Sequence, residues 1–196
     1  FTSDKISAYF INGLISTGCN VADAELSLRP VIQTAVLKEN FDGGAIITAS
    51  HNPPDFNGFK FTTQSGLPLF GESIGKLKEL CFSKKFKNGS EGDVSYVDIR
   101  ELYFQETLQH FRIKKNIKIV IDCGNGAAAK FAPDFFRKLG FEVISLYCNI
   151  NGNFPHHIPN PEARVNTLDL SEKVKEVNAD LGLAFDTDGD RVGVVD

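Results

Sequence analysis

The chain lacks several features that would place it in other classes of protein. It has no methionine or tryptophan, and its four cysteines (Cys19, Cys81, Cys123 and Cys148) form no CxxC pair. That spacing excludes a zinc finger and predicts buried or half-buried free thiols in a reducing cytoplasm. No apolar run approaches the roughly 20 residues that span a bilayer, so we expect no membrane partner. A net charge of −4 gives no electrostatic reason to bind nucleic acid.

Alternating strand and helix patterns predict the fold class. Strands are expected over 44–48, 58–63, 117–122, 141–147, 180–185 and 192–196. Helices are expected near the start of the chain, where Ser3 can act as the cap, from Pro30, and over 71–82, 99–111, 127–139 and 167–177. This rhythm predicts an α/β fold of two successive mixed, mostly parallel βαβ-type sheet domains covered by helices. The polar segment 83–93 divides the chain into domains 1–93 and 94–196, although a surface loop within one domain would have the same composition.

The first candidate site is the segment TASHNPP (48–54), which follows an apolar strand and precedes NGFK (57–60). The Asn-Pro-Pro step stops a helix or strand from continuing, because proline fixes φ and removes a donor. A stiff, exposed turn of this kind can hold Ser50 clear of its own backbone as a nucleophile, and Lys60 follows ten positions later. Taken alone, a Ser-His pair in a loop is more often a turn former.

The second candidate site is DTDGDR (186–191), which follows the apolar strand LGLAF. Asp186, Asp188 and Asp190 alternate along the chain and can converge on one hard cation such as Mg²⁺ or Ca²⁺. A solvated acidic turn is the simpler alternative. An EF-hand is excluded, because Arg191 stands where that loop needs glycine. A dehalogenase-type phosphatase loop stays a weak alternative, because that loop has threonine where this chain has Asp190.

A glycine-rich turn, GNGAAA (124–129), also follows an apolar strand, and Glu142 lies eighteen positions after Gly124. The pattern satisfies a relaxed dinucleotide-binding fingerprint. We interpret it instead as tight packing of a helix against a sheet, because a dehydrogenase would leave the serine and aspartate motifs unexplained.

Together these motifs resemble the α-D-phosphohexomutases, in particular the bacterial phosphomannomutase/phosphoglucomutase type. The resemblance rests on TASHNPPDFNGFK and DTDGDR, about 130 residues apart, with support from IVIDCGNGAAAKFAP (119–133) and NGNFPHHIPNPE (151–162). It covers most of domain 1 and domain 2 of that family. NGFK favours the mannose/glucose branch, whereas SLRP (27–30) stands where a Thr-Pro step is more usual.

The resemblance implies interconversion of hexose 6-phosphate and hexose 1-phosphate. Ser50 would carry a phosphoryl group, pass it to a phosphosugar to form a hexose 1,6-bisphosphate, and recover a phosphoryl group after the intermediate reorients. One Mg²⁺ would be held by Asp186, Asp188, Asp190 and a phosphate oxygen on Ser50, with Lys60 neutralising charge.

Three neighbouring side chains have supporting roles in this interpretation. Arg191 can bind phosphate through its planar guanidinium, or pair with the adjacent aspartates instead. His51 and Asn52 are expected to shape the serine loop. A catalytic-base role for His51 is disfavoured because adjacent side chains seldom face each other and no third orienting partner is visible.

The resemblance also implies what the chain leaves out. Because the chain starts at Phe1 and contains no methionine, we expect an internal piece of a longer polypeptide, whose C-terminal domains would supply sugar recognition. Two other classes stay open: a dehalogenase-type metal-dependent phosphatase with Asp186 as nucleophile, and a non-catalytic phosphosugar- or nucleotide-binding module.

We predict that this chain alone has negligible mutase turnover, because positioning of the substrate supplies most of the rate in such reactions. The measurement is conversion of mannose 1-phosphate or glucose 1-phosphate to the 6-phosphate at saturating Mg²⁺. Measurable turnover by this chain would contradict the prediction.

Overall fold

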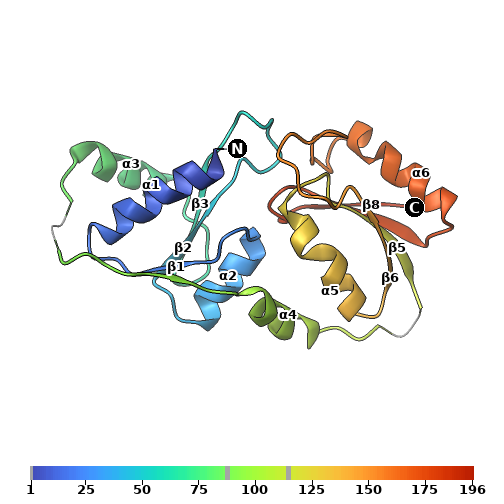
Figure 1. Cartoon of the computed structure of the whole chain (residues 1–196), viewed down its shortest axis with the longest axis horizontal. Helices are drawn as coiled ribbons and strands as arrows, with labels where there is room; N and C mark the ends of the chain where they lie inside the picture. The colour runs from blue at the N-terminus through green and yellow to red at the C-terminus, as the bar shows by residue number, and fades with distance from the viewer. Residues whose placement is uncertain (1, 87–88, 114–115) are drawn as a thin grey trace.

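A computed structural model describes residues 2–86, 89–113 and 116–196. Figure 1 shows two lobes, with α4 (Arg100–Leu108) between them. The first lobe contains α1 (Ser3–Ile15), β1 (Val21–Asp23), α2 (Arg29–Lys38), β2 (Gly43–Ile47), β3 (Phe59–Thr63), α3 (Glu72–Ser83) and β4 (Val94–Tyr96). The second contains β5 (Lys118–Asp122), the 3₁₀ helix η1 (Ala127–Lys130), α5 (Ala132–Lys138), β6 (Glu142–Leu146), η2 (Arg164–Thr167), α6 (Leu168–Glu176), β7 (Leu181–Phe185) and β8 (Val192–Val195).

The predicted α/β class is confirmed. The second lobe has one sheet in the order β6-β5-β7-β8, in which only the β7–β8 pair is antiparallel. In the first lobe β1 and β4 pair in parallel, and β2 and β3 pair antiparallel. The strand pairs are therefore mixed and mostly parallel, and parallel pairs need helical crossovers of the kind that the sequence shows.

The core of the second lobe follows from strand β5, which is buried from Ile119 to Asp122. Because successive side chains of a strand point to opposite faces, Ile119 and Ile121 pack in the cluster that includes α5, whereas Val120 packs with α6. A near-continuous apolar strand is typical of a parallel sheet covered on both faces. This rigid sheet carries the acidic loop at the end of β7.

The first lobe differs from the single sheet that we expected. Its strands form two separate two-stranded sheets, and our prediction lacks both β1 and β4. All three residues of β4 are exposed, so this strand has no alternating apolar pattern to reveal it. The domain boundary expected after residue 93 stays a prediction. The segment 83–93 includes residues 87–88, which lie outside the described residues. Phe1, on which the expectation of an internal piece partly rests, also lies outside them.

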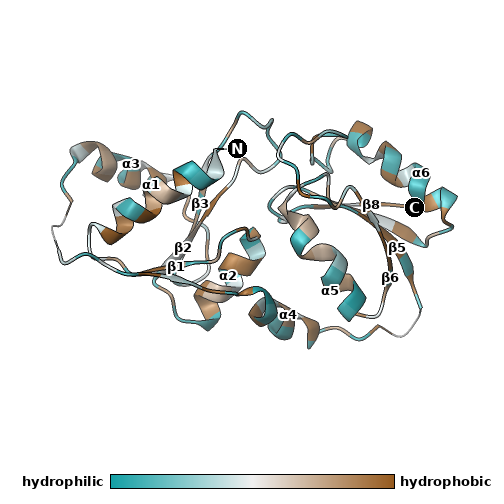
Figure 2. Cartoon of the chain, in the orientation of Figure 1, coloured by the Kyte–Doolittle hydropathy of each residue, from teal (hydrophilic) through white to brown (hydrophobic). Residues whose placement is uncertain are grey.

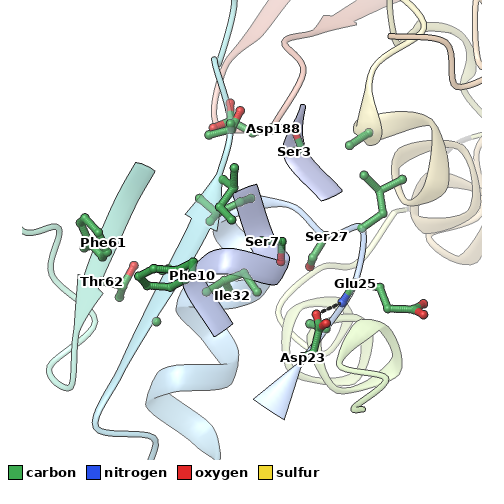
Figure 3. A pocket seen from close by; sticks show the side chains of 18 of the residues that line it. Ser3, Ser7, Phe10, Asp23, Glu25, Ser27, Ile32, Phe61, Thr62 and Asp188 are labelled. Atoms are coloured by element: carbon green, nitrogen blue, oxygen red, sulfur yellow. Dashed lines mark hydrogen bonds between the residues drawn. The ribbon is translucent and has the colours of Figure 1, made fainter. Parts of the chain in front are cut away.

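A cavity of about 1470 Å³ lies beside the two small sheets (Figure 3). Phe10 of α1, Ile32 of α2 and Phe61 of β3 line the apolar part of the cavity. Ser50 and Asp188 line its wall near the second lobe. Figure 2 shows apolar segments along α1, yet no residue of this helix is buried. The apolar face of α1 is therefore turned toward the cavity and only partly covered.

Two helix predictions need correction. The helix expected over 127–139 is split into η1 and α5, because Pro133 has no amide hydrogen and starts a new helix in its first turn. Ser3 was expected to cap the first helix, but Thr2 occupies that position and neither residue makes a side-chain capping bond. The structure shows no helix, among those it describes, that is long and apolar enough to cross a membrane.

The cysteine prediction is correct in part. All four cysteines are free, but Cys19 and Cys81 are exposed rather than buried or half-buried. Cys123 is buried at the end of β5, and its Sγ lies 3.3 Å from the Sγ of the half-buried Cys148. Cys19 and Cys81 both lie in the first lobe, where fewer residues surround each side chain than in the second lobe.

An ion pair between the buried Asp122 and the half-buried His157 connects the end of β5 to the loop after β6. His157 Nε2 donates to Asp122 Oδ2 at 2.9 Å, and its Nδ1 lies 3.0 Å from the carbonyl oxygen of Ile158. Both ring nitrogens face acceptors, which favours the protonated imidazolium. Burial lowers the pKa of His157, but the bonds to Asp122 and Ile158 outweigh it and raise the pKa above the usual 6.5.

We predict that the stabilising effect of His157 is lost as pH rises. A histidine whose pKa is raised by folding contributes its full stability below the unfolded pKa of 6.5, and this contribution disappears as pH rises through the folded pKa. The free energy of unfolding of His157→Gln should therefore differ more from that of the unchanged chain at pH 6.0 than at pH 8.5. Denaturant titrations measure this difference.

The exposed His110 offers a matched control. His110→Gln removes an imidazole from an exposed position and should change the free energy of unfolding only slightly. A pH-independent effect of His157→Gln would contradict the ion-pair interpretation.

Candidate active site

The serine loop is fixed by its own backbone. β2 ends at Ile47, and Ser50 has a φ of +55°, a left-handed conformation that costs a non-glycine residue free energy. Its amide donates to Thr48 Oγ1 at 2.8 Å, and Asn52 Nδ2 donates to the carbonyl oxygen of Ala49 at 2.8 Å. Ser50 is only 9% exposed, so the exposed turn that we expected places its central side chain inward instead.

Lys60 reaches the serine from the neighbouring strand. It lies in β3 opposite Ile46 of β2, so its position is set by the antiparallel register. Its Nζ is 3.2 Å from Ser50 Oγ, 2.7 Å from Asp188 Oδ2 and 2.8 Å from Asp190 Oδ2. One cation therefore contacts the serine of the first lobe and two carboxylates of the second.

The acidic loop starts where β7 ends and turns on Gly189, whose φ is +68°. Asp186 is fully buried: its Oδ1 accepts from the amides of Asp190 and Arg191, and its Oδ2 accepts from Ser50 Oγ at 3.2 Å. These bonds wrap the loop around one carboxylate. The two motifs, 136 positions apart in the sequence at this contact, thus meet in space.

Burial and neighbouring charge separate the acidities of these aspartates. Burial, followed by the nearby charge of Asp188, raises the pKa of Asp186 to about 7. For Asp190, burial also acts to raise the pKa, but the bonds from Lys60 and Arg29 outweigh it and lower the pKa below the usual range. Asp190 is therefore the stronger acid of the two, and Asp186 is the more readily protonated.

The three carboxylates fit a divalent cation. One oxygen from each of Asp186, Asp188 and Asp190 lies within 4.8 Å of the others. Asp188 is 2% exposed, and within the part of the chain that the structure describes neither of its oxygens accepts a well-directed hydrogen bond, although Lys60 is in ion-pair contact. A buried, under-coordinated carboxylate among oxygen donors is the environment that Mg²⁺ or Ca²⁺ requires.

His51 and Arg191 lie together at the edge of the site. His51 Nδ1 is 3.4 Å from Ser50 Oγ, so the two adjacent side chains do face each other, contrary to our expectation. The other ring nitrogen lies 3.5 Å from Arg191 Nη1, a cation rather than the carboxylate of a catalytic triad. Arg191 pairs with Glu162 at 3.0 Å and approaches Asp190 only to 3.9 Å.

Two glycines allow close packing around the acidic loop, and neither contact was predicted. A Cβ on Gly189 would lie 2.9 Å from Leu28, and a Cβ on Gly126 would lie 2.9 Å from the Cα of Thr187. The glycine-rich turn therefore packs against the acidic loop, and η1 is only a four-residue helix. Arg29, next to Leu28, donates to Asp190 Oδ2 at 2.8 Å. No sequence signal indicates this contact, because the partners are 161 residues apart.

The fold and site define the class of protein: an α/β protein that brings a serine hydroxyl, a lysine and three carboxylates together. Residues 1–88 match the family model described as phosphoglucomutase/phosphomannomutase, alpha/beta/alpha domain I, and residues 101–196 match domain II. The chain belongs to the α-D-phosphohexomutase family.

Individual relatives agree with this assignment. The chain is 45% identical over 185 residues to a phosphomannomutase/phosphoglucomutase of Pseudomonas aeruginosa, covering 94% of this chain and 40% of the relative. It is 39% identical over 192 residues to a phosphoglucomutase of Neisseria gonorrhoeae, covering 97% of this chain and 42% of the relative. A family protein from Burkholderia thailandensis superposes with a TM-score of 0.92 at 33% identity, over 98% of this chain and 43% of that one.

We predict that Asp188→Asn weakens Mg²⁺ binding at least tenfold, since it removes one of about three anionic ligands without changing side-chain shape. Isothermal titration calorimetry with Mg²⁺ measures the affinity. Asp134→Asn, which removes a carboxylate on α5 that pairs with Arg137, is the matched control and should leave the affinity unchanged. Equal affinities for the unchanged chain and Asp188→Asn would place the metal elsewhere.

Proposed function

We propose that this chain carries the phosphoryl-transfer half of a phosphohexomutase that interconverts hexose 6-phosphate and hexose 1-phosphate, of mannose or glucose. The chain spans 40% of the length of the first relative that it matches, so the activity belongs to the longer polypeptide and sugar recognition to its other domains. One observation carries the proposal: Ser50 Oγ lies between Asp186 and Lys60, at the meeting point of both motifs.

The residues suggest how the transfer is supported. In the forward half, the bond between Ser50 Oγ and phosphorus breaks, a sugar hydroxyl oxygen bonds to phosphorus, and the proton of that hydroxyl ends on Ser50 Oγ. In the return half, the bond between phosphorus and the other phosphorylated oxygen of the hexose breaks, Ser50 Oγ bonds to that phosphorus, and the proton of Ser50 ends on the released sugar oxygen. The proton of Ser50 already points to Asp186 Oδ2. Lys60, 3.2 Å from the oxygen that gains or loses phosphorus, neutralises the charge that develops there.

Asp186, Asp188 and Asp190 would hold one Mg²⁺, which when bound draws electron density from phosphoryl oxygens. The burial of Asp186 and Asp188 keeps water from screening their charges, whereas Asp190 is half-buried. Asn52 and the Thr48 hydroxyl hold the loop that presents Ser50. Arg191 lies at the site's edge beside His51, where it can turn from Glu162 to a phosphate group. The cytoplasmic location expected from the cysteines stays a prediction.

A dehalogenase-type phosphatase is the second candidate, and the geometry does not favour it. Its nucleophile would be Asp186, whose carboxylate is fully buried and already accepts three hydrogen bonds. Attack on a phosphorus atom would require an exposed oxygen. A non-catalytic binding module would not need the left-handed conformation of Ser50, which has a free-energy cost.

We predict that Ser50→Ala lowers mutase turnover of the full-length polypeptide by a factor of about 1000 or more, because it removes the atom that carries the phosphoryl group. The measurement is conversion of hexose 1-phosphate in the presence of hexose 1,6-bisphosphate and Mg²⁺, with phosphopeptide mapping of residues 44–63. Ser65→Ala, an exposed serine in the next turn, is the control and should retain full activity.

The same experiment separates the candidates. A phosphatase would release inorganic phosphate at an unchanged rate from Ser50→Ala and lose activity with Asp186→Asn. A binding module would show neither turnover nor phosphate on Ser50. Either result would contradict the proposed function.

A further inference from the structure

Arg29 touches the acidic loop twice from the first lobe. It is the first residue of α2, where its backbone amide donates to the carbonyl oxygen of Asp188 at 3.0 Å. Its Nη1 donates to Asp190 Oδ2 at 2.8 Å. The side chain is 29% exposed, so solvent screens this pair only in part. The segment SLRP (27–30), which stands where a Thr-Pro step is more usual in the family, therefore contacts the acidic loop directly through Arg29.

The cations that contact the carboxylates of the acidic loop come from the first lobe, not from the loop itself. Three carboxylates face two cations in direct contact, Lys60 and Arg29, whereas the closest carboxylate to Arg191 is Glu162. The two cations share a single oxygen, Asp190 Oδ2. A metal ion bound by Asp190 would therefore approach two positive charges, and each of them raises the free energy of binding a dication.

Lys60 contacts Ser50 Oγ as well as the two carboxylates and so belongs to the catalytic group. The side chain of Arg29 has no such contact: among the described residues, its only ion-pair partner is Asp190. Arginine keeps its charge at every physiological pH, and no pH change removes its effect. Of the two cations that contact Asp190, Lys60 also contacts Ser50, whereas the side chain of Arg29 contacts the carboxylate alone.

We propose that Arg29 sets the metal affinity of the site, by competing with the divalent cation for Asp190 and so weakening its binding. The inference rests on the metal site of the proposed function. A permanent cation at this position favours an exchangeable metal over a permanently bound one, because it neutralises one ligand whenever the metal leaves. Arg29 is a positioning residue and takes no part in bond making.

The test measures Mg²⁺ affinity by isothermal titration calorimetry for Arg29→Gln and Arg29→Lys. Arg29→Gln keeps a hydrogen-bond donor for Asp190 and removes the charge, so Mg²⁺ should bind about three- to tenfold more tightly. Arg29→Lys keeps the charge and should stay within about twofold of the unchanged chain. Arg137→Gln, which removes an equal charge from an ion pair on α5, should leave the affinity unchanged.

Each outcome decides the inference. Weaker binding by Arg29→Gln would show that Arg29 supports Asp190 as a ligand, and unchanged binding would make its ion pair a simple link between the lobes; both overturn the proposal. Equal tightening by Arg29→Lys would also overturn it, since charge would not be the cause. Thermal unfolding confirms that each variant is folded. If the unchanged chain binds no Mg²⁺, the proposed function itself fails.

Discussion

The contact of Lys60 with Ser50, Asp188 and Asp190 is the interaction on which the rest of the site depends. It joins a strand of the first lobe to the acidic loop of the second, so the serine and the carboxylates share one location. Without this cation, buried Asp188 would face its neighbours with no opposite charge, and such a carboxylate is costly to bury. The lysine makes the acidic cluster compatible with a folded chain.

Contacts other than ion pairs also hold the acidic loop in place. Backbone amides of the loop bind Asp186, Leu28 covers Gly189, and the Gly126 turn packs against Thr187. These contacts come from the loop itself and from two segments distant from it in sequence, and they position the carboxylates before any ligand binds. Preorganised charge of this kind does not have to rearrange during a reaction, which is how a site of a few residues can promote phosphoryl transfer.

Much of the fold was predictable from the sequence, because parallel strands with apolar runs and helices opened by proline leave local patterns. β5 and α2 are examples. The prediction failed where local pattern was weak. β4 has only exposed residues and owes its existence to pairing with β1, and the inward position of Ser50 depends on its left-handed backbone and on Asp186. The roles of Ser50, Lys60, Arg191 and the aspartates stay predictions.

The sequence by itself determined the family, the α/β class and the two motifs, since these are written in contiguous residues whose chemistry and spacing can be read directly. Only the tertiary structure decided which side chains share the site. Arg29 faces Asp190, His51 faces Arg191, and the glycine-rich turn supports the acidic loop. The first two contacts depend on how the two lobes pack against each other, and the third on packing within the second lobe. Packing between distant segments leaves no periodic signal in one chain.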